Sequence, residues 1–329
     1  MNKMYKIVID TKGADSGVGM VVRGAVEAIR KFDDLSILLV GDENELHTEC
    51  KQYEFSSHRI EILNAQSEIT NYDDPTAVIF AKADSSMAVA MRALAERDDI
   101  CGMISAGNTG AVLSGSLRYL SGKNRVRPAL AAILPAENGS FTCLVDTGAT
   151  IDCTPATLLH FARLGSDFMK KMYCIEAPRI GLLSNGAEPT KGNKLVKETH
   201  TLLKDQEDLN FIGNVEGNVA LSGMCDVLVC DGFAGNQVLK VSEGMAKRII
   251  TDIVKYAKRT ENPEIMKLAE HLMGVYDLSS LGGGIVLGIE KPIIKARGSS
   301  NEKSIVSISG MLLNLSKNEA IFDKEKVKI

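Results

Sequence analysis

Ile104-Ser-Ala-Gly-Asn-Thr-Gly-Ala-Val-Leu-Ser-Gly-Ser116, a third of the way along the chain, sets the architecture that we expect for it. The apolar residues 100–104 are typical of a short buried strand, and apolar residues recur at helical spacing after the glycines. The segment therefore predicts a strand, a tight turn and a helix. The first amides of such a helix have no internal partner and the helix dipole adds partial positive charge, so the turn is suited to an anion such as phosphate.

Small and polar residues make this turn a candidate anion site. Gly107 and Gly110 let the backbone approach a ligand, while Asn108 and Thr109 add side-chain donors. Ser105 or Asn108 can equally cap an ordinary helix, so the segment alone leaves both interpretations open. It contains neither the Gly-Lys-Ser/Thr of a P-loop nor the Gly-x-Gly-x-x-Gly of dinucleotide-binding folds.

Strand-like and helix-like segments alternate on both sides of this turn. Residues 6–10, 21–32 and 36–41 read as strand, helix and strand, a unit whose strands are expected to be parallel. Further strands are predicted at 59–63, 100–105, 130–134, 141–146, 179–184, 209–213 and 227–231, and helices at 75–97, 155–171, 189–204 and 234–258. The alternation predicts an α/β fold with helices flanking a largely parallel sheet.

The composition is that of a globular protein. The chain has 329 residues, 45% of them hydrophobic, enough for one large or two ordinary domains, and no linker divides it. A net charge of −4 argues against nucleic-acid binding through a basic surface. No signal peptide or bilayer-length apolar run is present, so a cytoplasmic location is expected. The seven cysteines form no Cys-x-x-Cys pair, which favours buried reduced thiols over zinc ligands.

Polar residues gather where predicted strands end. The dipeptide Gly-Asn occurs there, or near helix starts, at 107–108, 192–193, 213–214, 217–218 and 235–236. Asp10, Asp146 and Asp231 each close a predicted strand. Ligands of open parallel sheets bind at the carboxyl ends of the strands, so several of these turns are expected to converge. The aspartates either hold loop amides, orient a cation or bind a metal that bridges to the anion.

Two cationic segments complete the candidate site. Lys191, in Pro189-Thr-Lys-Gly-Asn193, falls at the start of a predicted helix, where a positive side chain is unfavourable unless an anion binds nearby. A solvated surface lysine explains it equally well. Lys295 and Arg297 precede a Gly-Ser-Ser turn that ends at Ser300, and this turn is a second candidate phosphate site.

Taken together, these motifs resemble the bacterial phosphate acyltransferase family, PlsX, over nearly the whole chain. The matching segments, in order, are Asp84-Ser-Ser-Met87, Ser105-Ala-Gly-Asn-Thr-Gly-Ala111, Arg127-Pro-Ala129, Leu144-Val-Asp-Thr-Gly-Ala149 with Asp152-Cys153, Lys191-Gly-Asn193, Phe211-Ile-Gly-Asn-Val-Glu-Gly217, Asp231-Gly-Phe-Ala-Gly-Asn236 and Gly298-Ser-Ser300. So many matches in one order are far more specific than any single motif.

The resemblance implies transfer of a fatty acyl group from acyl carrier protein to inorganic phosphate, an early step of phospholipid synthesis. It implies a three-layer α/β/α fold similar to isocitrate and isopropylmalate dehydrogenases, a single catalytic unit over 1–329, and no cofactor or metal. It also implies a homodimer with peripheral contact to the inner face of the cell membrane, for which residues 238–278 are the candidate region. Lys191 and Asn236 are the implied catalytic residues. The implied substrate-binding residues are Ser105, Gly107, Asn108, Thr109, Gly110, Asp146, Asn193, Asp231, Arg297 and Ser299.

Other functions stay open at this point. The chain departs from the usual family segments at 11–15, 184–189 and 282–288, and Arg297 stands where a histidine is usual. A related enzyme that uses an acyl-CoA donor, and a non-catalytic paralogue that binds acyl carrier protein or an acyl ligand, both fit these departures. A nicotinamide dehydrogenase is suggested by fold analogy alone.

Overall fold

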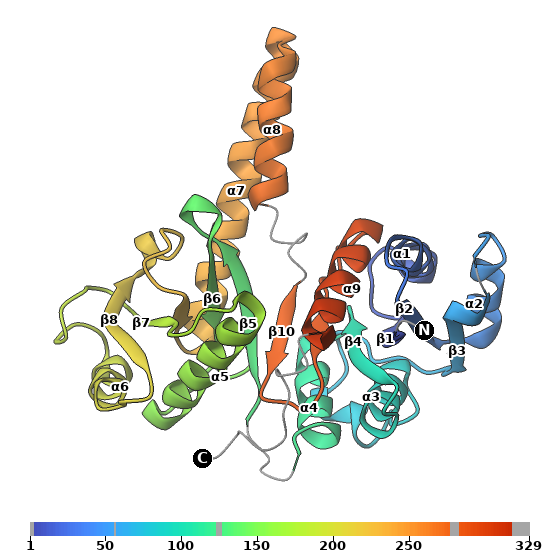
Figure 1. The fold of residues 1–329 in the computed structure, drawn as a ribbon, viewed down its shortest axis with the longest axis horizontal. Coiled ribbons are helices and arrows are strands. Elements are labelled where there is room, and N and C mark those ends of the chain that lie inside the picture. The colour runs from blue at the N-terminus through green and yellow to red at the C-terminus, as the bar shows by residue number, and fades with distance from the viewer. Residues whose placement is uncertain (1–2, 56, 123–126, 277–282, 318–329) are drawn as a thin grey trace. The chain divides into compact units, whose positions relative to one another are not determined.

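The computed structural model describes residues 3–55, 57–122, 127–276 and 283–317. The chain divides into two compact units, unit 1 (1–128 and 282–329) and unit 2 (129–281). Each unit holds a mostly parallel sheet between helices (Figure 1). The predicted α/β class and its three-layer arrangement are therefore confirmed, while a single catalytic unit over 1–329 stays a prediction.

The sheet of unit 1 brings three strand ends to one edge. Its strand order is β3-β2-β1-β4-β11-β10, and only β10 runs antiparallel to its neighbour. Asp10 pairs in register with Ser105, and Ser105 with Lys295, so the polar turns after β1, β4 and β11 lie together. The strand bounds are β1 Tyr5–Asp10, β2 Leu35–Gly41, β3 Ile60–Asn64, β4 Ile100–Ser105, β10 Gly284–Leu287 and β11 Ile293–Lys295.

Helices cover both faces of this sheet. On one face α1 packs on α9, where Gly24 of α1 sits against the Ile305 side chain; α3 and α4 pack together on the other (Figure 1). The helix predicted over 75–97 is wrong in part, because a short 3-10 turn, η2 (Pro75–Val78), is separated from α3 by a loop. Ser85 caps α3 by accepting from the Ala88 amide. The helix bounds are α1 Gly17–Lys31, α2 Glu43–Cys50, α3 Ser86–Glu96, α4 Thr109–Tyr119 and α9 Glu302–Lys317.

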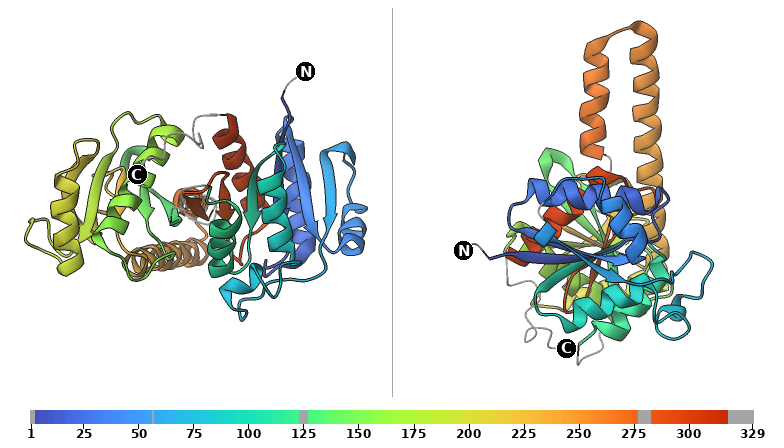
Figure 2. Two further views of the ribbon diagram at one scale, coloured as in Figure 1. Left: turned by 90° about the horizontal axis from the view of Figure 1, so that it is seen from below. Right: turned by 90° about the vertical axis from the view of Figure 1, so that its right-hand side faces the viewer.

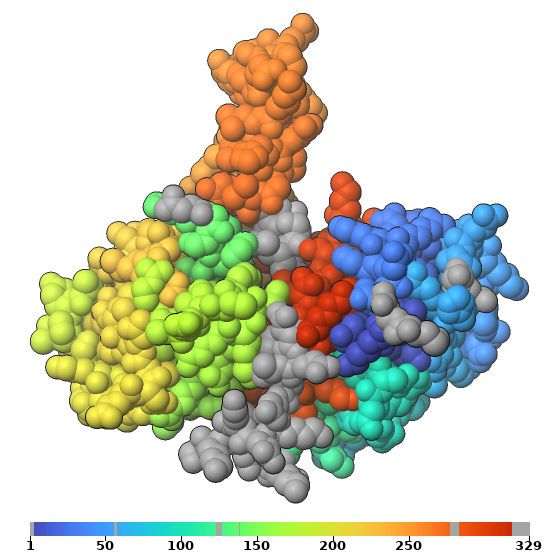
Figure 3. All heavy atoms as spheres, viewed as in Figure 1, coloured from blue at the N-terminus to red at the C-terminus, as the bar shows by residue number. Residues whose placement is uncertain are grey.

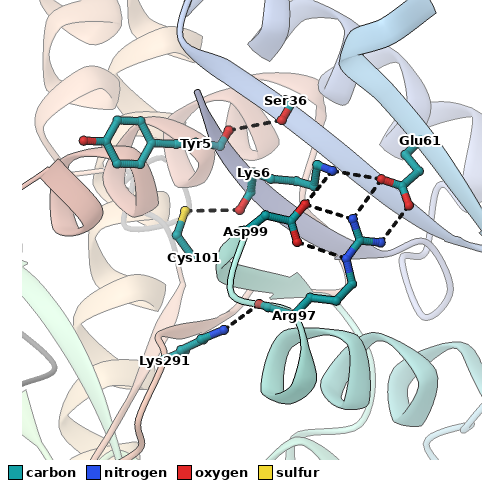
Figure 4. A network of polar contacts seen from close by, with 8 residues as sticks. All are labelled: Tyr5, Lys6, Ser36, Glu61, Arg97, Asp99, Cys101 and Lys291. Atoms are coloured by element: carbon teal, nitrogen blue, oxygen red, sulfur yellow. Dashed lines mark hydrogen bonds and ion pairs between the residues drawn. The ribbon is translucent and has the colours of Figure 1, made fainter. Parts of the chain in front are cut away.

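An ion-pair network joins the amino ends of the unit 1 strands (Figure 4). Lys6 of β1 contacts Glu61 of β3 at 2.9 Å and Asp99, just before β4, at 2.7 Å. Arg97 contacts both carboxylates, at 2.6 and 2.9 Å. These charges lie at the edge opposite the polar turns, so we assign them to holding strands together.

Unit 2 has the strand order β5-β6-β9-β7-β8. β5 and β6 form an antiparallel hairpin, and the other pairs are parallel. The parallel strands β6, β9, β7 and β8 therefore end at one edge, as in unit 1. The bounds are β5 Ala129–Pro135, β6 Phe141–Val145, β7 Arg179–Ser184, β8 Asn210–Glu216 and β9 Val227–Val229.

The helices of unit 2 also pack on both faces. Gly165 of α5 lies against Val145 and Val227, whereas the start of α7 packs on the alternate residues Leu144 and Leu228. Beyond its first turns α7 extends away from the sheet and pairs with α8 in a long helical hairpin (Figures 1 and 2). The bounds are α5 Pro155–Tyr173, α6 Lys194–Lys204, α7 Gly232–Thr260 and α8 Pro263–Tyr276.

Candidate functional site

A buried carboxylate organises the carboxyl edge of unit 1. Asp10 is 3% exposed and accepts hydrogen bonds from Ser86 Oγ at 2.6 Å and Ser105 Oγ at 2.7 Å. The Lys12 amide donates to the same carboxylate at 3.3 Å. Burial raises the pKa of Asp10, and the hydroxyl donors oppose that rise. Asp10 therefore connects the ends of β1 and β4 to the start of α3. Through the Lys12 amide it also holds a loop amide, which is one of the roles that the sequence left open.

The predicted turn between β4 and α4 forms as expected. The Gly107 amide donates to Ser105 Oγ at 3.2 Å, and Asn108 Oδ1 caps α4 by accepting from the Ala111 amide at 3.1 Å. Thr109 and Gly110 are the first residues of α4, and amides at that position have no acceptor within the helix. The turn therefore contains the predicted cap, and the predicted anion site at the same turn stays a prediction.

Close packing explains two glycines of this edge. Gly13 has φ +86°, and a Cβ there would lie 2.5 Å from Gly107 Cα. A Cβ on Gly110 would lie 2.7 Å from Pro75 Cγ. A larger side chain at any of these glycines would push the loops apart.

The turn after β11 completes this edge. The Ala296 amide donates to the Ser105 carbonyl at 2.9 Å, and the Asp15 amide to the Gly298 carbonyl at 2.8 Å. The turn closes on itself because the Arg297 amide donates to Ser300 Oγ at 3.1 Å. Arg297 is half-buried and Ser299 is exposed. Within unit 1 the structure therefore brings the turns that carry Ser105, Gly107, Arg297 and Ser299 to one edge.

In unit 2 the carboxylate of Asp146 is fully used by backbone amides. Asp146 is buried and accepts from Leu130 at 2.9 Å, Gly148 at 3.3 Å, Ala149 at 3.1 Å and Thr150 at 2.6 Å. Its contacts are those of a residue that shapes the turn after β6. Its predicted contact with substrate stays a prediction.

The start of α7 packs directly on that turn. Asp231 caps the helix by accepting from the Ala234 amide at 2.7 Å. A Cβ on Gly232 would lie 2.7 Å from Asp146 Oδ2, and one on Gly235 would lie 1.9 Å from the Asp146 carbonyl oxygen. Asn236 follows on the second turn, half-buried.

Lys191 lies in a loop and not in a helix. The helix predicted from 189 begins at Lys194, because Asn193 Oδ1 accepts from the Val196 amide at 2.9 Å and caps it. Lys191 therefore does not lie at the start of a helix, contrary to the prediction, and its role in the reaction stays a prediction. Lys191 is exposed, and its stem packs over Gly186, where a Cβ would lie 2.6 Å from Lys191 Cγ.

Two residues of this region were missed by sequence reasoning. Asn185 Oδ1 accepts from the Gly192 amide at 2.9 Å, and Asn214 Nδ2 donates to the Glu188 carbonyl at 2.8 Å. Asn214 belongs to one of the recurrent Gly-Asn pairs, but that pair lies inside β8 and not in a turn. Ser86, which binds Asp10, was also missed, although it belongs to the Asp-Ser-Ser motif.

The cysteines of the described residues are free thiols, and their predicted burial is confirmed for four of them and wrong for Cys174. Cys50, Cys143, Cys225 and Cys230 are buried, and Cys174 is exposed. Burial raises the pKa of Cys143 to about 12, so this thiol is held protonated and unreactive.

The fold and its loops define an α/β protein with anion-suited turns at the carboxyl edge of parallel strands. Solved structures with this fold include a phosphotransacetylase from Streptococcus pyogenes (TM-score 0.65, 17% identity, 97% of this chain and 96% of that one). A 4-hydroxythreonine-4-phosphate dehydrogenase from Salmonella typhimurium is similar at TM-score 0.52 and 14% identity, covering 96% of this chain and all of that one (100%). These likenesses show the fold.

Sequence comparison identifies the family. Residues 5–310 match the model of the FA_synthesis family, described as fatty acid synthesis protein. The chain is 37% identical to a phosphate acyltransferase of Clostridium novyi and 39% identical to one of Caldanaerobacter subterraneus, each over 98% of both chains. This chain belongs to that family, and the resemblance read from its motifs is confirmed.

Proposed function

We propose that this chain is an enzyme that transfers a fatty acyl group from acyl carrier protein to inorganic phosphate, giving acyl phosphate for phospholipid synthesis. The observation that carries the proposal is the full-length similarity to proteins named phosphate acyltransferase. The anion-suited turn between β4 and α4 supports it from the structure, because one substrate of that reaction is inorganic phosphate.

Unit 1 supplies the phosphate-binding residues of this proposal. In this proposal, phosphate accepts from the first amides of α4, at Thr109 and Gly110, and lies at the positive end of the helix dipole. Asp10 and Ser105 hold that turn in place from within the sheet edge. Arg297 and Ser299 belong to the neighbouring turn, where a guanidinium and a hydroxyl suit phosphate oxygens.

The reaction needs no protein nucleophile. A phosphate oxygen attacks the thioester carbonyl carbon, the C–O bond forms, the C–S bond breaks, and the carrier leaves as a thiolate that takes up a proton. Negative charge develops on the carbonyl oxygen in the transition state. We assign Lys191 to steadying phosphate or that charge and Asn236 to donating to an oxygen, with Asn193 and Asp231 capping the helices beside them.

The helical hairpin of unit 2 is the proposed interface of a homodimer. Val241, Met245 and Ile249 recur at four-residue spacing on α7 and are 63%, 55% and 52% exposed. An apolar stripe of this kind is covered in most soluble proteins, and a second copy of α7 offers the same stripe. Figure 3 shows the hairpin standing clear of the rest of unit 2.

Peripheral membrane contact is proposed for the same hairpin. Basic residues lie alongside the stripe on α7 and follow it, and exposed apolar residues recur on α8, a combination that binds anionic lipid surfaces. None of the helices in the described ranges is long and apolar enough to cross a membrane. The residues concerned are Lys247, Arg248, Lys255, Lys258 and Arg259 on α7, and Leu268, Met273, Val275 and Tyr276 on α8.

The test of the function is phosphate-dependent release of free carrier protein from palmitoyl-ACP, with the product trapped as the hydroxamate by hydroxylamine. Palmitoyl-CoA is run in parallel. Turnover with palmitoyl-ACP that requires phosphate supports the proposal. Turnover with palmitoyl-CoA and not with palmitoyl-ACP would show that the acyl donor is acyl-CoA. Binding of carrier protein without turnover of either donor would leave a regulatory role.

A further inference from the structure

We propose that Asn214 is a positioning residue that fixes the loop carrying Lys191. The proposal rests on the proposed function, because the role of Lys191 in the reaction is part of that function. Asn214 lies near the carboxyl end of β8 and contacts the loop 185–193 that follows β7. It acts on Lys191 through the backbone of that loop and not by touching substrate.

A break in the strand register aims Asn214 at the loop. Ile180 pairs with Phe211 and Gly181 with Gly213, so Ile212 is an extra residue on β8. Gly213 has φ +103°, a conformation that glycine adopts readily. Bulges of this kind re-aim the next side chain and occur beside active sites. After the bulge Asn214 is 7% exposed, whereas Ile212 is 41% exposed.

The amide of Asn214 ties the loop to the sheet. Its Nδ2 donates at 2.8 Å to the carbonyl oxygen of Glu188, and the same oxygen accepts from the Lys191 amide at 3.0 Å. On the other side of Lys191, the Gly192 amide donates to Asn185 Oδ1 at 2.9 Å. The backbone of the loop is therefore held at Glu188, before Lys191, and at Gly192, after it.

The amide oxygen of Asn214, by contrast, destabilises the folded state. Among the residues that the structure describes, this buried Oδ1 has no hydrogen-bond partner, and neither has the buried Ser184 Oγ at the end of β7. A buried acceptor left unpaired destabilises the folded state, so a fold selected for stability alone would favour an apolar residue here. The hydrogen bond to Glu188 is the contact that an apolar residue at this position could not make.

Asn214→Leu separates positioning from stability, because leucine has nearly the same shape and neither donates nor accepts. We expect kcat/KM for palmitoyl-ACP with phosphate to fall by about 100-fold, as misplaced catalytic groups do, while Tm stays the same or rises. Asn210→Leu is the matched control, since Asn210 also donates from Nδ2 to a backbone carbonyl, that of Ala177 at 3.0 Å, but at the amino end of the same strand. It should leave kcat/KM unchanged. Asn214→Asp, which keeps the size and removes the donor, is the second variant if leucine prevents folding.

Two further measurements test the route through Lys191. In a Lys191→Ala background, adding Asn214→Leu should lower kcat/KM by less than about twofold, because residues that act as a unit are not additive. Hydrogen exchange of the Lys191 and Gly192 amides should speed up in Asn214→Leu and not in Asn210→Leu. Wild-type kcat/KM in Asn214→Leu, full additivity, or unchanged exchange would each overturn the proposal. If the wild-type chain turns over neither donor, the proposed function fails, and the exchange result alone decides whether Asn214 holds the loop.

Discussion

The hydroxyl of Ser105 donates to the buried carboxylate of Asp10 at 2.7 Å and accepts from the Gly107 amide at 3.2 Å. One side chain thus connects the end of β1 to the turn that begins α4. A bond made inside the sheet edge therefore holds that turn in place.

Ser105→Ala should weaken phosphate binding and the fold together. The buried Asp10 carboxylate would lose a donor, which costs about 1–3 kcal/mol, and the Gly107 amide would lose its acceptor. We expect a lower Tm and a higher KM for phosphate. Ser36→Ala is the control, because Ser36 Oγ donates to the Tyr5 carbonyl at the opposite edge (Figure 4), and it should leave that KM unchanged. An unchanged KM in Ser105→Ala would remove this turn from the phosphate site.

The β4–α4 junction was predictable because its determinants are local. Apolar residues mark the strand, glycines mark the turn, and Asn108 is a cap three residues before the amide that it binds. The same local logic predicted β1, β2, β6 and β7 close to their bounds.

The missed features depend on partners far along the chain. The predicted strand 209–213 stops at Gly213, yet pairing with β7 continues β8 to Glu216 across a bulge, which glycine in a strand often marks. The short strands β10 and β11 were not predicted, since a run such as Ile293–Lys295 becomes a strand only by pairing with β4. The family departure at 282–288 falls in this region, and Gly282 lies outside the described residues.

Glu61 should make the fold sensitive to acid. Hydrogen bonds from Arg97, and then from Lys6, lower the pKa of this carboxylate from 4.5 to about 2. A carboxylate whose pKa is lower in the folded state than in the unfolded state stabilises the fold at a pH above its unfolded-state pKa. That stabilisation is lost as the pH falls through the folded-state pKa. Wild-type Tm should therefore drop between pH 5 and about 2, and Glu61→Gln should flatten that drop. Equal pH dependence in both proteins would show that Glu61 of the network (Figure 4) does not contribute to the acid sensitivity.

Two glycines of α7 should respond in opposite ways to alanine. At Gly235 a Cβ would lie 1.9 Å from the Asp146 carbonyl oxygen, so alanine must displace the helix from the β6 turn. We expect a loss of about 1–3 kcal/mol in the free energy of unfolding, with reduced turnover because Asn236 shifts. At Gly244 a Cβ would lie within 4 Å of no described residue beyond the adjoining turns of α7, and alanine should stabilise the helix by about 0.4–1 kcal/mol. Denaturant unfolding of the two variants measures both, and a stable Gly235→Ala would contradict the packing described here.

Lys191→Ala should reduce kcat/KM by about 100- to 1,000-fold without lowering Tm, as loss of a group that stabilises developing charge does. The side chain is exposed and its loop is held by backbone bonds, so the fold does not depend on the ammonium group. Lys194→Ala is the matched control, since Lys194 lies three residues away with 89% of its side chain exposed, and it should retain wild-type turnover. Lys191→Arg keeps the charge but changes its reach, so partial activity is expected. Steady-state kinetics with palmitoyl-ACP and phosphate measure all three, and full turnover in Lys191→Ala would remove this residue from the mechanism.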